Sequence, residues 1–170
     1  MEFRTPQLAE EDEIRDLVVE AFGDEGPQIG ELVSEMLIEP RCRLWVADRS
    51  GIEGVIGLSQ ASIEPITDEV IWILAPLAVK AASQRTGLGG LLVRHCLQEL
   101  ENDGATGVLV YGDPEYYGRF GFSRESASHV PAPFPLEYPE GWQALWWKPV
   151  DTSGAKRLVV TEPLNRPELW

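Results

Sequence analysis

The chain has 170 residues, 44% of them hydrophobic, and a chain of this length can bury roughly 70% of its unfolded surface in one core without disulfides or metals. Its 28 acidic and 14 basic side chains give a net charge of −14, which argues against nucleic acid as a partner because duplex binding relies on clustered Lys and Arg. Two cysteines and two histidines are too few for a disulfide framework or a four-ligand zinc site, so we expect no metal and a reducing compartment.

Two amphipathic helices are predicted near the N-terminus, after a short strand at 2–5. Their apolar residues recur at i, i+3, i+4, i+7 and i+8, the spacing that forms one stripe along a helix. The stripes are Ile14, Leu17, Val18, Ala21 and Phe22 in the first helix, and Ile29, Leu32, Val33, Met36 and Leu37 in the second. The second helix ends at Pro40, and we expect both helices to cover one face of a sheet.

Several strands and one long helix follow. Segments 43–47, 54–63 and 70–79 are typical of strands and predict an antiparallel meander. A helix at 88–101 then leads to a strand at 108–111, and a crossover of this length favours parallel pairing. After residue 123 the chain is rich in proline and tryptophan, with a strand expected around 143–147 and another in the final stretch. The order predicts an α/β fold of one domain, residues 1–170, with a mixed and mostly antiparallel sheet.

A glycine-rich turn joins the strand at 70–79 to the helix at 88–101. Its glycines at 87, 89 and 90 let backbone N–H groups approach an anion at the helix start. A dinucleotide-binding fingerprint starting at Gly87 would need a glycine where Leu92 stands, and no glycine here is followed by the lysine of a Walker loop. The pattern therefore indicates another kind of phosphate-binding turn.

Residues 84–89, Gln-Arg-Thr-Gly-Leu-Gly, resemble the Q/R-x-x-G-x-G/A segment with which the GNAT superfamily of N-acetyltransferases holds the pyrophosphate of acetyl coenzyme A. Downstream, the segment GDPEYYGRFGF at 112–122 has Tyr117 four residues before Gly121-Phe122, the spacing found in the family. Leu74 to Val79 is similar to the LxPLAV strand of a bacterial subgroup of these enzymes. The resemblance is strong over about 70–122.

This resemblance implies the GNAT fold, with helices on both faces of the sheet and two splayed central strands that receive the coenzyme's pantetheine arm. Pro76 agrees with it, because proline cannot donate a ladder hydrogen bond and so marks a parting of strands, an edge or a plain bulge. The implied cosubstrate is acetyl-CoA. The residues expected to bind it are Leu77, Ala78, Val79, Gln84, Arg85, Thr86, Gly87, Leu88, Gly89 and Gly90.

The implied reaction moves an acetyl group to an amine, on a small molecule or a peptide, by direct attack in a ternary complex. A lysine-like amine is protonated near pH 7, and deprotonating it costs roughly 4.6 kcal/mol, so a general base is useful. We expect Glu69 in this role, with Glu64 as second choice. By the resemblance, Tyr117 is the general acid toward the coenzyme sulfur; the alternative is a core tyrosine whose hydroxyl bonds to the backbone. The asparagine often found seven residues before this tyrosine is replaced by Val110.

Two other functions remain open: a non-catalytic sensor or regulatory module that binds acyl-CoA, and an acyltransferase acting on a non-amine small molecule. No segment approaches the 18 apolar residues of a membrane span, and the acidic N-terminus is unlike a signal peptide. We therefore expect a cytoplasmic protein, monomeric or homodimeric, that binds neither membranes nor nucleic acid.

Overall fold

The computed structural model describes residues 1–66 and 68–170. The chain forms two compact units, the first of Met1–Leu58 and Ala75–Glu99, the second of Ser59–Leu74 and Leu100–Trp170. Strands β3 (Ile52–Glu64) and β4 (Ile71–Val79) and helix α3 (Leu88–Asn102) contribute residues to both units. Among the described residues, no helix is both long enough and apolar enough to span a lipid bilayer.

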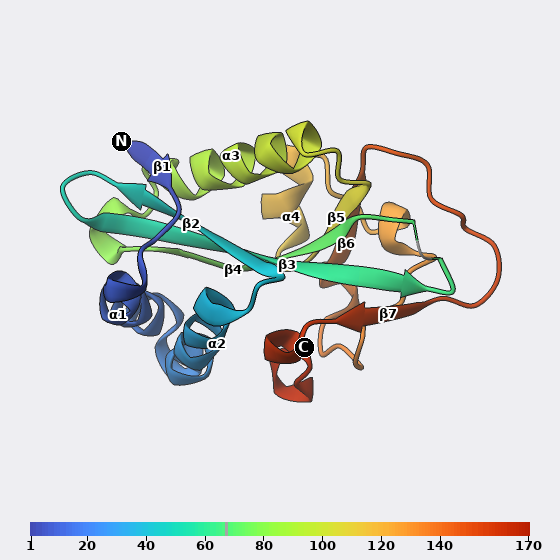
Figure 1. The fold of residues 1–170 in the computed structure, drawn as a ribbon, viewed down its shortest axis with the longest axis horizontal. Helices are drawn as coiled ribbons and strands as arrows, with labels where there is room; N and C mark the ends of the chain where they lie inside the picture. The colour runs from blue at the N-terminus through green and yellow to red at the C-terminus, as the bar shows by residue number, and fades with distance from the viewer. Residues whose placement is uncertain (67) are drawn as a thin grey trace. The chain divides into compact units, whose positions relative to one another are not determined.

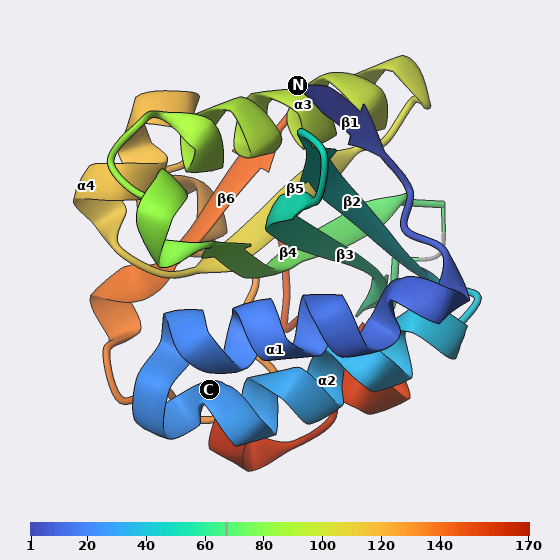
Figure 2. The same ribbon diagram turned by 90° about the vertical axis from the view of Figure 1, so that its left-hand side faces the viewer.

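The first unit contains the two expected N-terminal helices. Its other elements are β1 (Glu2–Arg4), α1 (Glu11–Phe22), α2 (Gly26–Ile38) and β2 (Cys42–Asp48). In this unit α1 and α2 lie on one face of the strands and α3 lies on the other (Figures 1 and 2). The stripe residues Ile14, Leu17 and Val18 of α1 are buried, as are Leu32, Val33 and Met36 of α2. The periodicity therefore identified the packed faces of both helices.

Strand β1 is held in the first unit by a pair of carboxylates around Arg4. The guanidinium contacts Glu10 with both terminal nitrogens, at 2.9 and 2.6 Å, and Asp48 through Nε and Nη2, at 3.0 and 2.6 Å. The carboxylate of Glu10 also accepts the N–H of Gln7, and that of Asp48 accepts the N–H of Gly51. Arg4 thus joins β1 to the start of α1 and to the β2–β3 turn.

The second unit is built around β5 (Gly107–Tyr111). Ile71–Leu74 of β4 pair with it in parallel, and β6 (Trp142–Trp146) pairs with it antiparallel. Ala61–Glu64 of β3 pair antiparallel with β7 (Arg157–Val160). The short helix α4 (Pro114–Tyr117) follows β5. Trp142 and Trp146 donate their indole N–H groups to the carbonyls of Val130 and Ser126, at 2.7 Å each, so both indoles tie β6 to segment 126–130.

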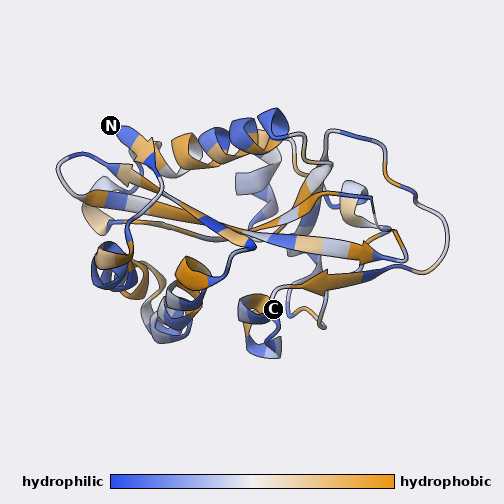
Figure 3. Ribbon diagram, in the orientation of Figure 1, coloured by the Kyte–Doolittle hydropathy of each residue, from blue (hydrophilic) through white to orange (hydrophobic). Residues whose placement is uncertain are grey.

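The strands pair in the order β1-β2-β3-β4-β5-β6, with β7 on β3. The expected mixed sheet, its helices on both faces, and the parallel pairing across the α3 crossover are confirmed. Figure 3 shows hydrophobic residues along the strands and a mixture of both kinds on the helices. The register of β4 with β5 runs from Ile71 to Leu74, and β4 continues to Val79. A parting of these strands at Pro76 stays a prediction.

Candidate functional site

The glycine-rich turn lies in the first unit, between β4 and α3. Gln84, Arg85, Thr86 and Gly87 are exposed there, and both Arg85 (φ +60°) and Gly87 (φ +89°) have left-handed backbones. A non-glycine residue pays for that conformation, so the sharp bend at Arg85 is held by the surrounding structure. The Nε2 of Gln84 donates to the carbonyl of Val79 at 3.1 Å, and the hydroxyl of Thr86 donates to the carbonyl of Ser83 at 2.6 Å. The side chain of Gln84 thus anchors the turn to the end of β4, and that of Thr86 bonds it to the segment just before it.

Helix α3 starts directly after this turn. The N–H of Leu91 bonds to the carbonyl of Gly87 at 3.1 Å, so the N–H groups of Leu88, Gly89 and Gly90 belong to the first turn, which has no carbonyl one turn earlier in the helix. The helix dipole adds a partial positive charge at this end. Backbone donors and dipole together make the start of α3 suitable for an anion such as a pyrophosphate.

The end of β4 offers further backbone donors in the same unit. The N–H of Lys80, just after the strand, bonds to the carbonyl of Glu53 in β3 at 2.9 Å. Backbone groups of successive strand residues point to opposite edges, so the N–H groups of Leu77 and Val79 point away from β3. Ala78, between them, is 3% exposed and packs in the core. The N–H groups of Leu77 and Val79 therefore lie on the same edge of β4.

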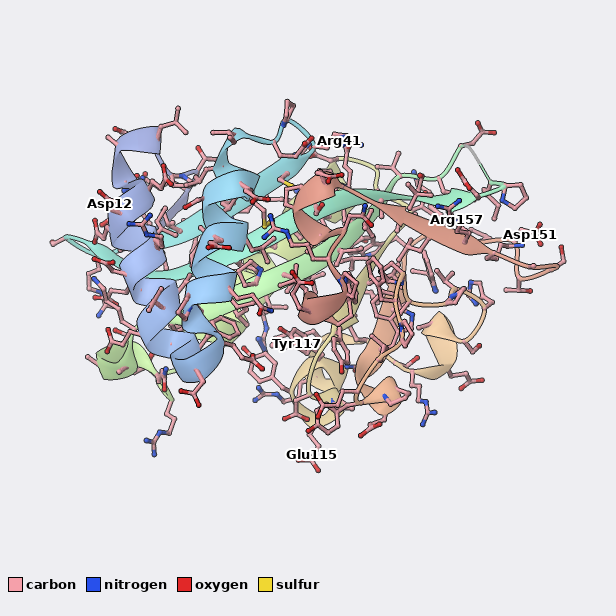
Figure 4. The ribbon with its side chains drawn as sticks, turned by 90° about the horizontal axis from the view of Figure 1, so that it is seen from below. Asp12, Arg41, Glu115, Tyr117, Asp151 and Arg157 are labelled. Atoms are coloured by element: carbon pink, nitrogen blue, oxygen red, sulfur yellow. The ribbon has the colours of Figure 1, made fainter. Side chains whose placement is uncertain are left out.

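Tyr117 is the last residue of α4 in the second unit. Asp113 caps this helix by accepting the N–H of Glu115 at 2.9 Å, and Pro114 occupies its first position. Figure 4 shows Glu115 on the outside of α4 and Tyr117 on its inner side. The Tyr117 ring packs edge to face against Tyr116 and Phe122, with ring centroids 5.0 and 5.7 Å apart. The cap and the aromatic contacts fix the ring in one orientation.

The hydroxyl of Tyr117 is the chemically important end of this side chain. Tyr117 as a whole is only 9% exposed, so its ring lies in the interior of the unit. Burial raises the pKa of the phenol above its ordinary value, and Tyr116 adds to the rise. The phenol therefore keeps its proton at neutral pH. The role of Tyr117 as the general acid stays a prediction, and so does the alternative of a core tyrosine.

The two carboxylate candidates lie elsewhere in the second unit. Glu69 is half-buried and precedes the N-terminal end of β4, where Val70 bonds with Thr106. Tyr117 follows the C-terminal end of β5, which runs parallel to β4, so the two residues lie at opposite ends of the paired strands. Glu64 is exposed and forms an ion pair with Arg157 at 3.8 Å. The structure therefore does not bring Glu69 and Tyr117 together, and the role of Glu69 stays a prediction.

One buried polar residue beside this region escaped the sequence reasoning. Gln143 is 1% exposed and donates its amide to the carbonyls of Gly112 and Gly141, at 3.2 Å each. It is the single polar residue in the run Trp142–Trp147, and that isolation was the signal that could have identified it. His95 of α3 stacks on Phe3 with ring centroids 5.1 Å apart.

No group of three or more His, Cys, Asp or Glu side chains close enough to hold an ion occurs in the described part of the chain.

Comparisons with known proteins agree on one family. Residues 40–124 match the family model of the acetyltransferase (GNAT) domain. The chain is 30% identical over 148 residues to YjhQ of Escherichia coli K12, an uncharacterized N-acetyltransferase, covering 85% of this chain and 81% of that protein. It is 34% identical over 83 residues to a second uncharacterized N-acetyltransferase of that strain, YhbS, covering 48% of this chain and 47% of YhbS.

Solved structures agree with the sequence matches. A GNAT family acetyltransferase from Brucella melitensis, crystallised with acetyl-CoA, superposes with a TM-score of 0.75 at 26% identity, covering 95% of this chain and 96% of that chain. The YhbS structure from Escherichia coli, in complex with CoA, has the same fold, with a TM-score of 0.82 at 21% identity and coverage of 97% and 92%. Because the family model spans half of the chain and YjhQ matches most of it, the chain belongs to the GNAT family of acetyltransferases, the class of N-acetyltransferase that its sequence predicts.

Proposed function

We propose that the protein is an acetyl-CoA-dependent N-acetyltransferase that transfers the acetyl group to an amine of a small molecule or peptide. Family membership supports the reaction class, and the Brucella melitensis relative was crystallised with acetyl-CoA. The observation that carries the proposal for this chain is the exposed turn at 84–87, which bends through two left-handed residues directly into the start of α3.

The coenzyme would bind through backbone groups. The N–H groups of Leu88, Gly89 and Gly90 would bind the pyrophosphate, with the side chain of Arg85 adding a positive charge. Gln84 and Thr86, already hydrogen-bonded within the turn, would hold its shape.

The pantetheine arm would lie along the edge of β4 that faces away from β3, beyond Pro76, where β4 and β5 are predicted to part. There the N–H groups of Leu77 and Val79 would donate to the arm, and the small side chain of Ala78 would let the strand remain flat. One of these N–H groups would also stabilise the negative charge that develops on the thioester oxygen during attack.

Acetyl-CoA supplies the thioester, and the acceptor amine attacks its carbonyl carbon directly. The C–N bond forms, the C–S bond breaks, the amine loses a proton to a base, and the departing sulfur takes a proton from Tyr117. A thiol has an ordinary pKa of about 8.5 and a phenol one of about 10, so complete transfer from Tyr117 is uphill by at least roughly 2 kcal/mol. Burial increases this gap. Tyr117 would therefore donate its proton as the C–S bond breaks, and the neutral phenol would be recovered from solvent afterwards.

Glu69 is the proposed base, acting through a chain of ordered water because it lies at the other end of the β4–β5 pair from Tyr117. Glu69→Gln tests this role. Loss of the acidic limb from the pH profile of kcat/KM would support the assignment, and an unchanged profile would remove Glu69 from the mechanism.

The deciding experiment is calorimetric titration with acetyl-CoA, followed by thiol-release assays across a panel of amines. Arg85→Gln should weaken coenzyme binding, whereas Tyr117→Phe should retain binding and lose turnover. Product mass spectrometry with and without hydroxylamine identifies the acceptor atom, because hydroxylamine cleaves acetyl esters and leaves acetamides intact. Binding without turnover on any acceptor, unaffected by Tyr117→Phe, would favour the sensor, and failure to bind acetyl-CoA would refute the proposal.

We further propose that residues 1–170 act as one acetyltransferase domain in the cytoplasm.

A further inference from the structure

The ring of Tyr117 packs directly on the backbone of Gly112, the first residue after β5. A Cβ atom at position 112 would lie 2.5 Å from Cε2 of Tyr117 and 3.0 Å from its Cδ2. Carbon atoms in contact normally stay at least about 3.5 Å apart, so a side chain here would displace the ring. The backbone of Gly112 is not in the left-handed region. The ring contact, and not the backbone conformation, is therefore what requires glycine.

Gly112 is held in place by the beginning of β6. Its N–H donates to the carbonyl of Gly141 at 3.0 Å, which extends the β5–β6 ladder by one pair beyond Tyr111 and Trp142. Its carbonyl accepts from the side-chain amide of Gln143 at 3.2 Å. Both backbone groups of Gly112 are thus bonded, and the segment leading into α4 starts from a fixed point.

The Gln143 amide uses both of its protons in this arrangement. One is donated to the carbonyl of Gly112 and the other to the carbonyl of Gly141, in a site where the side chain is 1% exposed. A primary amide is an uncharged side-chain group that offers two N–H donors on one nitrogen. An apolar or acidic side chain at position 143 would therefore lose both hydrogen bonds. A polar residue buried in an apolar strand costs stability unless it is bonded in this way.

We propose that Gly112 and Gln143 are positioning residues for Tyr117, an inference that rests on the proposed function because Tyr117 is the acid of that reaction. Gly112 provides the surface on which the ring packs, and Gln143 holds the carbonyl of Gly112 so that this surface does not move. Neither residue touches the reacting atoms. Together they set where the phenol oxygen lies, and misplacement of a reacting group by about 1 Å can cost on the order of 100-fold in rate.

Two variants and two matched controls test this inference. Gly112→Ala inserts one methyl group against the ring, and Gly118→Ala adds the same group at the residue after Tyr117, where no atom other than those of its chain neighbours lies within 4 Å. Gln143→Met removes both amide bonds at nearly constant size. Thr106→Val removes a comparable buried bond, from the Val70 N–H to the threonine hydroxyl at 3.2 Å, at the opposite end of β5.

The primary readout is the NMR signal of the Tyr117 ring in protein labelled at its tyrosines, assigned from its absence in Tyr117→Phe. Gly112→Ala and Gln143→Met should shift this signal, whereas Gly118→Ala and Thr106→Val should leave it unchanged. This measurement requires no substrate, so it decides the positioning role even if the enzyme's acceptor is different from the one proposed. An unchanged Tyr117 signal in both test variants would overturn the inference, and if one of them fails to fold the other decides it.

Kinetics provide the second readout. Gly112→Ala and Gln143→Met should lower kcat about tenfold or more while the KM values for acetyl-CoA and acceptor change less than about twofold, since general acid catalysis is worth about 100- to 10,000-fold. In a Tyr117→Phe background the same changes should cost nothing further, because the group that they position is absent. Additive losses in that background would overturn the inference. Full activity of Tyr117→Phe itself would instead refute the acid role in the proposed function, with the NMR result still standing.

Discussion

Gly57 in β3 allows β3 and β4 to approach closely in the first unit, and Gly57→Ala should separate them. A Cβ atom at position 57 would lie 2.4 Å from the carbonyl oxygen of Ala75 and 2.8 Å from the terminal methyl of Met36. The methionine methyl can move aside at little cost. The carbonyl of Ala75 is backbone, so β4 itself must shift.

The expected cost follows from this overlap. Overpacking by one methyl group in a buried position costs about 1–3 kcal/mol of unfolding free energy, a large part of the 5–15 kcal/mol typical of a domain. The shift of β4 would also reach Leu77 and Val79, whose N–H groups are proposed to bind the coenzyme. Each such hydrogen bond is worth about 0.5–1.5 kcal/mol, so we expect roughly tenfold weaker binding of acetyl-CoA.

Urea denaturation and calorimetric titration with acetyl-CoA measure the two effects. The control is Gly118→Ala, at a position with helical backbone angles (φ −55°, ψ −28°) and open space, where stability should stay equal or rise by a few tenths of a kcal/mol. A Gly57→Ala protein as stable as the parent would refute the reasoning from the close approach. A destabilised variant with unchanged coenzyme affinity would show that β4 beyond Ala75 does not contribute to binding.

Three further predictions concern single side chains. Arg85→Gln should weaken acetyl-CoA binding roughly tenfold and reduce the salt dependence of binding, because a charge-assisted phosphate contact would be lost. Calorimetry at two ionic strengths measures both effects, and an affinity equal to the parent's would exclude Arg85 from the site. Asp113→Ala should destabilise α4 by about 1 kcal/mol because the helix loses its cap, and it should lower kcat more than it raises KM. Unchanged steady-state kinetics would contradict the role of α4 in holding Tyr117 in place. Arg4→Met should destabilise the protein most at neutral pH. Hydrogen bonding to Arg4 lowers the pKa of Glu10. The pKa of Asp48 is lowered first by the N–H of Gly51 and then by Arg4. The stabilisation of the folded state by these ionised carboxylates therefore exists above the ordinary carboxyl pKa and disappears as pH falls below about 4. Urea midpoints measured from pH 3 to 7 should therefore converge with the parent's at the acidic end, and a constant difference would refute the linkage.

The helices and strands were predictable because the information for each is contiguous in the chain. The apolar stripes of α1 and α2, the strand patterns and the turn into α3 each occupy a short window, and all were expected within a few residues of their observed bounds. The Tyr117 segment was found in the same way, from the spacing of Tyr117 and Gly121-Phe122 within one short motif, and the cap at Asp113 could be read from its neighbours.

Only the tertiary structure decided which distant residues meet. Gln143 bonds to Gly112 across 31 residues because the β5–β6 register puts Val110 opposite Gln143, and a register shift of one residue would have turned that amide to the other face of the sheet. The parallel pairing of β4 and β5, which the length of the crossover indicates, puts Glu69 and Tyr117 at opposite ends of the two strands. Local patterns are set by neighbouring residues, whereas strand register depends on the whole buried face of the sheet. The sequence by itself therefore determined the elements and the family, and only the fold determined the surroundings of Tyr117.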